Sequence, residues 1–320
     1  MKIIYSPLHK KHHPSFEVYD GDKSAYPEVP DRIETIVTSL QKEKLGEITS
    51  PQSFSIAYTK KIHQKNYVEF LKNTSQQLKP HDNFFASYFI TDTYAPFTGG
   101  TFMAAKKAVD VALSGAELVK NGEKLAYSLS RPPGHHAGYV NMGGYCYFNN
   151  AAIAAQYLSD FGKVTILDID YHHGNGTQQA FYERDDVLYI SLHADPNKKY
   201  PYITGFADEV GSGKGKGYNK NYPLPVKTTE KLYQQTLQEA LYDMQKFDPT
   251  FLVLSAGFDT YEKDPIGSFQ LSIPFYQTIG EMITSFAIPT LVIQEGGYYV
   301  EDLGKMAVSL VKGLQIKSLS

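Results

Sequence analysis

The stretch that decides the fold is VTILDIDYHHGNGTQ, residues 164–178. It begins as a short apolar run rich in β-branched residues and leads directly into acidic, imidazole and glycine residues. Such a run predicts a strand buried in a parallel sheet and followed by a polar loop. Because alternate residues of an extended segment face the same way, Asp168, Asp170 and His172 are predicted to share one face.

The same alternation of short apolar runs and longer amphipathic stretches extends over all 320 residues. It predicts an α/β fold in one domain, residues 1–320, around a buried parallel sheet. Strands are predicted at 2–5, 125–130, 164–170, 187–193, 251–255 and 290–294. Helices are predicted at 32–43, 64–73, 100–120, 149–160, 231–246, 274–286 and 303–314. Two remaining stretches, 9–31 and the glycine-rich 205–225, are predicted to be long surface loops, which at this length are often functional.

Four of the predicted strands end in residues that carry chemistry. Besides the strand at 164–170, the strand at 125–130 runs into RPPGHH, the strand at 251–255 into AGFD, and the strand at 290–294 into EGGY. In an open parallel sheet, ligands bind outside the carboxyl ends of the strands. One polar loop after a strand is common, but four together predict a shared active site.

Composition narrows the classes of function. The formal net charge is −3 with both signs mixed along the chain, so neither nucleic acid nor a membrane is predicted as a partner. Cys146 is the only cysteine, so a metal site must use oxygen and nitrogen ligands. The first residues lack a signal-peptide core, and no apolar run approaches the roughly 18 residues of a membrane span. A cytoplasmic location is predicted, although a C-terminal secretion signal would escape this reasoning.

Asp259 supplies the third member of a predicted metal site. It follows the apolar run at 251–255, where a buried carboxylate is costly unless it is paired or bound to a metal. With Asp170 and His172 it offers two carboxylates and one imidazole, which balance the charge of Zn²⁺ and leave a fourth position for water and a substrate oxygen. Fe²⁺ would fit the same ligands. Each residue alone is more often a helix cap or a hydrogen-bonded core residue, so the prediction depends on the set.

The adjacent residues His135 and His136 are the second predicted group. Two imidazoles in different surroundings can differ in pKa, so one can be a base for water while the other stays protonated. Tyr298, after two glycines, can donate to an oxyanion near the metal. The alternatives are a surface histidine pair, which is the interpretation for His12 and His13, and one surface tyrosine among 25.

Together these motifs resemble the arginase/deacetylase superfamily, in its histone deacetylase branch. The matching segments follow in family order over nearly the whole chain: RPPGHHAG at 131–138, GGYCYFNNAAIAA at 143–155, LDIDYHHGNGTQ at 167–178, SLHADP at 191–196, SAGFDT at 255–260 and EGGY at 295–298. The resemblance implies the arginase/deacetylase fold, with a central parallel sheet of about eight strands and helices on both faces. It also implies zinc-dependent removal of acetyl groups from amines.

The resemblance assigns roles to individual residues. It implies zinc on Asp170, His172 and Asp259, and a tandem histidine pair whose members are supported by Asp168 and Asn175. It implies that Tyr298 completes the polarisation of the carbonyl. It further implies that the Gly144 carbonyl accepts the substrate N–H and that Tyr145 and Tyr200 form aromatic walls. A structural potassium ion is implied at Asp168, Asp170, His172, Ser191 and Leu192.

Within this branch the chain resembles bacterial acetylpolyamine amidohydrolases. EVYDGDKSAYPEVPDRIE at 17–34, which includes Tyr19, is similar to their long first loop, and residues 193–224 follow their pattern. In those enzymes the first loop narrows the tunnel, often across a dimer interface, so a homodimer is implied here. Asp92 matches an acidic residue near the entrance that attracts the distal ammonium. Ile266 stands where a related eukaryotic polyamine deacetylase has a selecting glutamate, so that device is absent.

The predicted reaction is hydrolysis of the acetyl amide in acetylated polyamines or other small acetyl-amines. One histidine of the pair removes a proton from water, and the other, assigned to His136, protonates the leaving amine. Three alternatives stay open. The first is a deacetylase of acetyl-lysine in proteins, which needs a wider entrance than the long first loop leaves. The others are a ureohydrolase with two manganese ions, which needs a second set of aspartates, and an inactive module that binds acetylated ligands.

Overall fold

The computed structural model describes residues 1–19 and 21–316. Position 20 of the predicted first loop, and residues 317–320, where a C-terminal signal would lie, are outside the described residues. The centre is an eight-stranded sheet in which all neighbouring strands run parallel. In spatial order its strands are β4 (Glu47–Thr49), β1 (Lys2–Ile4), β5 (Leu125–Ser128), β10 (Thr290–Gln294), β9 (Phe251–Ala256), β6 (Val164–Asp168), β7 (Val187–Ala194) and β8 (Asn219–Leu224). The predicted sheet of about eight parallel strands is confirmed.

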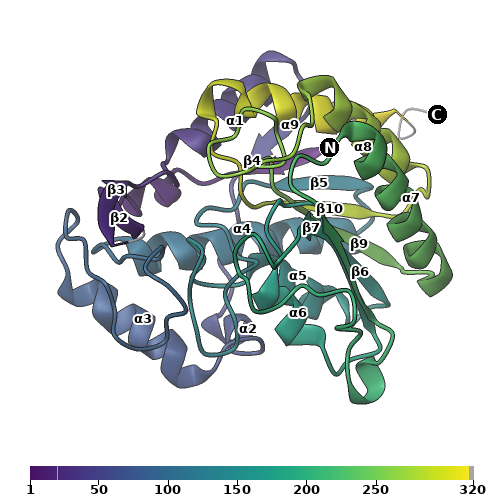
Figure 1. The fold of residues 1–320 in the computed structure, drawn as a ribbon. Helices are drawn as coiled ribbons and strands as arrows, with labels where there is room; N and C mark the ends of the chain where they lie inside the picture. The colour runs from purple at the N-terminus through teal and green to yellow at the C-terminus, as the bar shows by residue number, and fades with distance from the viewer. Residues whose placement is uncertain (20, 317–320) are drawn as a thin grey trace.

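Helices cover both faces of the sheet (Figure 1). One face carries α1 (Asp31–Lys42), α7 (Glu230–Phe247), α8 (Ile273–Thr284) and α9 (Val300–Gln315). The other face carries α4 (Thr101–Lys120), α5 (Asn150–Leu158) and α6 (Asn175–Phe181), with the short α2 (Ile56–Thr59) and α3 (Lys65–Gln77) outside α5 and α4. The chain is therefore a three-layer α/β structure with the sheet buried in the middle.

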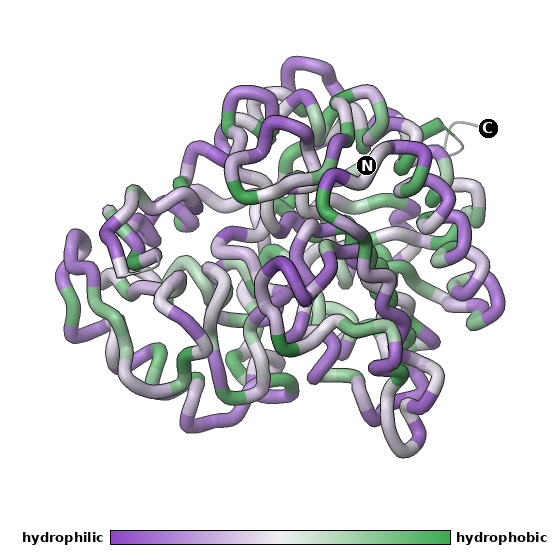
Figure 2. The backbone as a smooth tube through the Cα atoms, viewed as in Figure 1, coloured by the Kyte–Doolittle hydropathy of each residue, from purple (hydrophilic) through white to green (hydrophobic). Residues whose placement is uncertain are grey.

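Side chains of the central strands alternate between two hydrophobic cores. In β6, Leu167 packs with the core under α7–α9, whereas Ile166 packs with the core under α4 and α5. In β9, Leu254 and Val253 divide in the same way. Figure 2 shows these strands in hydrophobic colours, while much of the outer backbone is hydrophilic. Burial on both faces explains why the central strands read as continuous apolar runs.

Two strands of the main sheet were missed by the sequence prediction. The stretch 205–225, predicted as a surface loop, ends in β8, and β4 was not predicted at all. Both are edge strands, each paired on one side only, so their sequences, NKNYPL and EIT, lack an apolar run. The short helices α2 and α6 were also missed.

The stretch 9–31 is not the surface loop that was predicted. It contains the end of a 3₁₀ helix (Pro7–Lys11) and a hairpin of β2 (Phe16–Tyr19) and β3 (Asp22–Ala25), which lies beside the main body in Figure 1. The surface interpretation of His12 is wrong, because its ring is fully buried and its Nδ1 lies 2.9 Å from the Thr101 hydroxyl at the start of α4. His13 is exposed, as predicted. No helix within residues 1–19 and 21–316 is both long and apolar enough to cross a membrane.

Candidate active site

The four strands with chemically active ends are neighbours in the sheet. The order β5-β10-β9-β6 places them side by side at its centre, although β5 and β6 are separated from β9 and β10 by long stretches of chain. Their carboxyl ends therefore bring His135 and His136 together with Asp170, Asp259 and Tyr298. This is the edge of an open parallel sheet at which ligands bind.

Asp170, His172 and Asp259 form one buried group whose ligand atoms all lie within 4.8 Å of one another. The Nδ1 of His172 is 3.0 Å from Oδ2 of Asp259 and 3.4 Å from Oδ1 of Asp170. Backbone groups hold the carboxylates in place, because the Tyr171 N–H donates to Asp259 Oδ1 at 2.9 Å and the Gly296 N–H donates to Asp170 Oδ2 at 2.8 Å. The loops after β6, β9 and β10 are thus joined at this group.

β6 ends at Asp168, two residues earlier than the predicted strand. Asp168 and Asp170 nevertheless reach the same side, as the alternation predicted, because His135 contacts both: its Nδ1 lies 3.1 Å from Asp168 Oδ2 and its Nε2 lies 3.7 Å from Asp170 Oδ1. Asp170 also lies 3.4 Å from His172 Nδ1, so it connects the histidine pair with the Asp170, His172 and Asp259 group.

The electrostatics of the group fit a divalent cation. Burial, together with the neighbouring Asp170 carboxylate, raises the pKa of Asp259 to about 7. Burial lowers the pKa of His172, but its hydrogen bonds to Asp170 and Asp259 outweigh this and raise the pKa to about 9. Two close carboxylates away from water are costly without a compensating positive charge. Their oxygen and nitrogen donors are those that Zn²⁺ accepts, with a position left open for catalysis.

His135 and His136 lie in contact but in different electrostatic surroundings. Their ring centroids are 4.0 Å apart, and His135 Nδ1 is 3.1 Å from Asp168 Oδ2, whereas His136 Nδ1 is 2.7 Å from Asn175 Oδ1. Burial opposes the charge on His135, but the nearby aspartates raise its pKa to about 10. Burial and the positive field of His135 hold the pKa of His136 well below its usual value. The two neighbouring rings therefore differ strongly in their affinity for a proton.

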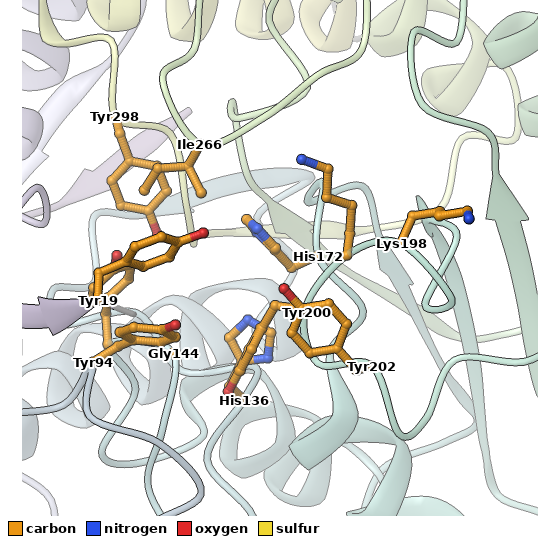
Figure 3. Close-up of a pocket in the computed structure, with 12 residues that line it drawn as sticks. Tyr19, Tyr94, His136, Gly144, His172, Lys198, Tyr200, Tyr202, Ile266 and Tyr298 are labelled. Carbon is orange, nitrogen blue, oxygen red and sulfur yellow. The ribbon is translucent and has the colours of Figure 1, made fainter. Parts of the chain in front are cut away.

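A cavity of about 210 Å³ leads to this group (Figure 3). Its walls are mostly aromatic, and its lining consists of Tyr19, Tyr94, His136, Gly144, Tyr145, His172, Lys198, Lys199, Tyr200, Tyr202, Ile266 and Tyr298. The Tyr200 ring packs edge-on against His136 at 4.8 Å, and the Tyr298 ring lies 5.5 Å from that of Tyr145. Burial raises the pKa of Tyr298 well above 10, so its phenol keeps its proton and can donate it in a hydrogen bond.

Gly144 is required where the cavity wall meets the histidine pair. Its φ is +51°, in the left-handed region that favours glycine. A Cβ at this position would stand 2.3 Å from the His136 ring. The glycine therefore permits the backbone to approach the histidine.

A family model, relatives of known name and a solved structure identify the family of this chain. The family model described as "Histone deacetylase domain" matches residues 26–314. The chain belongs to the histone deacetylase family. It is 41% identical to acetylpolyamine amidohydrolase 2 of Pseudomonas aeruginosa over 98% of this chain and 99% of that protein, and 36% identical to acetylpolyamine amidohydrolase of Mycoplana ramosa over 98% and 99%. The crystal structure of acetylpolyamine aminohydrolase from Burkholderia pseudomallei superposes with a TM-score of 0.95 at 35% identity, covering 99% of both chains.

These comparisons make the chain a hydrolase of the histone deacetylase family, similar over its length to bacterial acetylpolyamine amidohydrolases. Its buried Asp-His-Asp group is typical of the zinc site of this family. The predicted family, fold and enzyme class are confirmed.

Several residues predicted from the family likeness lie elsewhere than in the cavity lining. Asp92 stands behind it, where its Oδ2 accepts from the Gly144 N–H at 3.0 Å and the Tyr200 hydroxyl at 2.7 Å. It thereby braces two cavity walls, and its expected attraction for an ammonium stays a prediction. Ser191 faces Asp168 across the β6–β7 pair, next to Leu192, and its hydroxyl lies 2.7 Å from His193 Nδ1. The potassium ion also stays a prediction.

Sequence reasoning missed three buried charged groups that hold the site loops. Glu295 accepts from the N–H groups of Gly134 and His135 at 2.7 and 3.2 Å, which fixes the loop of the histidine pair. Glu28 accepts from Arg32 and Arg131, joining the first loop to the end of β5. The sequence did offer a signal for these groups, because Glu295 and Arg131 are charged residue types within the EGGY and RPPGHHAG segments.

Asp264 is the third missed group. Its Oδ1 accepts from the N–H groups of Ile266 and Gly267 at 3.0 and 3.2 Å, and its Oδ2 accepts from those of Tyr298 and Tyr299 at 2.7 and 3.2 Å. One buried carboxylate therefore joins the loop that carries Ile266 to the loop that carries Tyr298. Nothing in the local sequence KDPIGS indicates the second loop.

Proposed function

We propose that the chain is a zinc-dependent amide hydrolase that removes acetyl groups from small acetylated amines, acetylated polyamines among them. The observation that carries the proposal is the convergence of the Asp170, His172 and Asp259 group with His136 and Tyr298 at the inner end of one aromatic cavity. The names of relatives that match over nearly their whole length support the substrate class.

The chain's own residues supply most of the reaction. A zinc ion held by the three ligands would act as a Lewis acid and lower the pKa of water. Neutral His136 takes a proton from the attacking water and later delivers it to the leaving nitrogen, so acetate and an amine are released. Tyr298 donates a hydrogen bond to the carbonyl oxygen as negative charge develops there. His135, kept protonated by Asp168 and Asp170, adds positive charge beside the reacting centre.

This division of labour refines the prediction from sequence. From the sequence, we predicted that His136 protonates the leaving amine and that the other histidine of the pair removes the proton from water. The lowered pKa of His136 and the raised pKa of His135 support one histidine in both steps, because only a group that is neutral at the start can accept the proton of water.

Three finer features also belong to the proposal. Fe²⁺ fits the same donors as Zn²⁺. A potassium ion at Asp168, Ser191 and Leu192, with Asp170 and His172, would lie between β6 and β7. A homodimer would place a second chain against the exposed hairpin of β2 and β3, which carries Tyr19.

The alternatives have less support. A protein deacetylase needs an open entrance, but here Tyr19 of the hairpin stacks on Tyr94 at 5.8 Å at the rim of the cavity. A ureohydrolase needs a second set of aspartates, and in the described part of the chain the other group of potential ligands is His135, Cys146 and Glu295. An inactive binding module would have no use for both histidines and Tyr298.

The test is kcat/KM of the zinc-loaded protein on acetylputrescine, acetylcadaverine and N8-acetylspermidine, against an acetyl-lysine peptide. We expect the free amines to be preferred, and His136→Ala and Tyr298→Phe to lose roughly 100-fold or more. Preference for the peptide would overturn the substrate class but keep the chemistry. Near wild-type turnover by either variant would overturn the assigned roles.

A further inference from the structure

Two lysines lie at the mouth of the cavity. Lys198 and Lys199 belong to its lining, and Figure 3 shows Lys198 on the side opposite Tyr19. No carboxylate among residues 1–19 and 21–316 forms an ion pair with either ammonium group. Lys199 Nζ instead lies 6.0 Å from the centre of the Tyr171 ring, next to the metal-binding segment.

The turn that carries these lysines is held firmly to the sheet. It follows the end of β7, and the Asp195 N–H donates to the Leu224 carbonyl of β8 at 2.8 Å. The Asp195 carbonyl then accepts from the N–H groups of Lys198 and Lys199 at 2.9 and 3.1 Å. The Asp195 carboxylate is engaged with Asn197, at 2.9 Å from its N–H and its Nδ2. The backbone thus presents both lysines from a fixed position, directly before Tyr200, which packs on His136.

We propose that Lys198 and Lys199 form an anion subsite, which selects acetylated amines whose far end carries a carboxylate, such as an acetylated ω-amino acid or free Nε-acetyl-lysine. This deepens, and rests on, the proposed deacetylation of small amines. Two unpaired ammonium groups at a cavity mouth attract an anionic end and repel a second ammonium. Long acetylpolyamines, which carry additional ammonium groups, are then poorer substrates than an acetylated amino acid of the same length.

Three probes on one skeleton test the charge alone: 6-acetamidohexanoate, its neutral carboxamide, and acetylcadaverine with a terminal ammonium. We expect kcat/KM to fall in that order. In Lys198→Gln/Lys199→Gln the ratio of acid to carboxamide should drop about 3- to 10-fold, because two partly exposed charge pairs contribute modestly each. The ratio should also shrink as ionic strength rises from about 10 to 150 mM, since the Debye length falls from about 30 to 8 Å.

The control is Lys214→Gln/Lys216→Gln, which removes the same charge from exposed lysines in another loop. The proposal is overturned if the ratio is unchanged in the Lys198/Lys199 variant, if the control changes it equally, or if acetylcadaverine is the best wild-type substrate. Turnover of the neutral carboxamide reports the proposed function separately, since it does not depend on the lysines' charge.

A binding measurement covers the case of weak turnover. Calorimetric Kd values of suberic acid monohydroxamate and of its terminal amide, on the zinc-loaded protein, compare an anionic with a neutral end. Tighter binding of the acid, lost in the Lys198/Lys199 variant and kept in the control, supports the subsite. Equal Kd values overturn it.

Discussion

Replacing Asp264 with asparagine should impair catalysis by displacing Tyr298. Asp264 holds this residue by its backbone, because Asp264 Oδ2 accepts a hydrogen bond from the Tyr298 N–H. The wild-type carboxylate accepts four backbone N–H groups, two on each oxygen. An asparagine keeps one acceptor oxygen, and its NH₂ group must face the other two donors. Two charge-assisted hydrogen bonds are then lost, at about 1.5–3 kcal/mol each, so either the Ile266 loop or the Tyr298 loop is released.

The magnitude is limited by what Tyr298 contributes. Removing one donor to a developing oxyanion costs roughly 100- to 1000-fold. If the loosened loop places the Tyr298 phenol correctly for only part of the time, part of this rate enhancement is lost. We therefore expect kcat to fall about 10- to 100-fold. The free energy of unfolding should fall by about 3 kcal/mol or more, which leaves a typical domain folded at 20 °C.

A double-mutant cycle with Tyr298→Phe separates this role from general destabilisation. If Asp264 acts by positioning the phenol, Asp264→Asn should lower kcat by less than about 2-fold in the Tyr298→Phe background. Asp110→Asn is the matched control, because Asp110 is a buried aspartate on α4 that accepts from the Phe54 N–H at 3.0 Å, away from the cavity. Equal losses of kcat in both backgrounds, or a similar loss in the control, would refute the reasoning.

Three further predictions follow from the site and its supports. Asn175→Asp places a negative charge at 2.7 Å from His136 Nδ1, so the pKa of His136 should rise. The acidic limb of the pH profile of kcat/KM should then move to higher pH by about one unit or more. A limb that does not move would contradict His136 as the base. His63, whose Nδ1 donates to the Gly138 carbonyl while its Nε2 accepts from the Asn149 N–H, has its pKa lowered to about 4 by burial. The contribution of neutral His63 to the free energy of unfolding is complete above pH 6.5 and is lost as pH falls toward 4. The difference in free energy of unfolding between wild type and His63→Gln, measured with urea, should therefore shrink by up to about 1.4 kcal/mol per pH unit over this range. A difference that stays constant with pH would contradict this prediction. Adding Zn²⁺ to metal-free protein should raise Tm, and Asp259→Asn should weaken the rise, whereas an equal rise in both would argue against this ligand set.

Much of the site could be predicted from sequence because its chemistry is concentrated in short segments. Each central strand is buried on both faces, so it appears as an apolar run, and the reactive residues follow directly, as Asp170 and His172 follow β6. Edge strands have no such signal. β8 is polar because its buried Asn219 and Asn221 donate hydrogen bonds to Gln178 and to backbone carbonyls of the preceding loop. The hairpin of β2 and β3 lies in a stretch whose sequence shows no periodicity.

The sequence by itself determined which residues carry chemistry and that they lie at strand ends. Only the tertiary structure decided which strands are neighbours: β9 and β10 insert between β5 and β6, and this brings Asp259 to His172 and Tyr298 to the same cavity. It also decided the supports, such as Asp264, which accepts from the Tyr298 N–H, and the position of Lys198 and Lys199 at the mouth of the cavity. The physical reason is that strand identity follows from local burial, whereas hydrogen bonds and charge pairing between distant segments depend on which strands lie next to each other in the sheet.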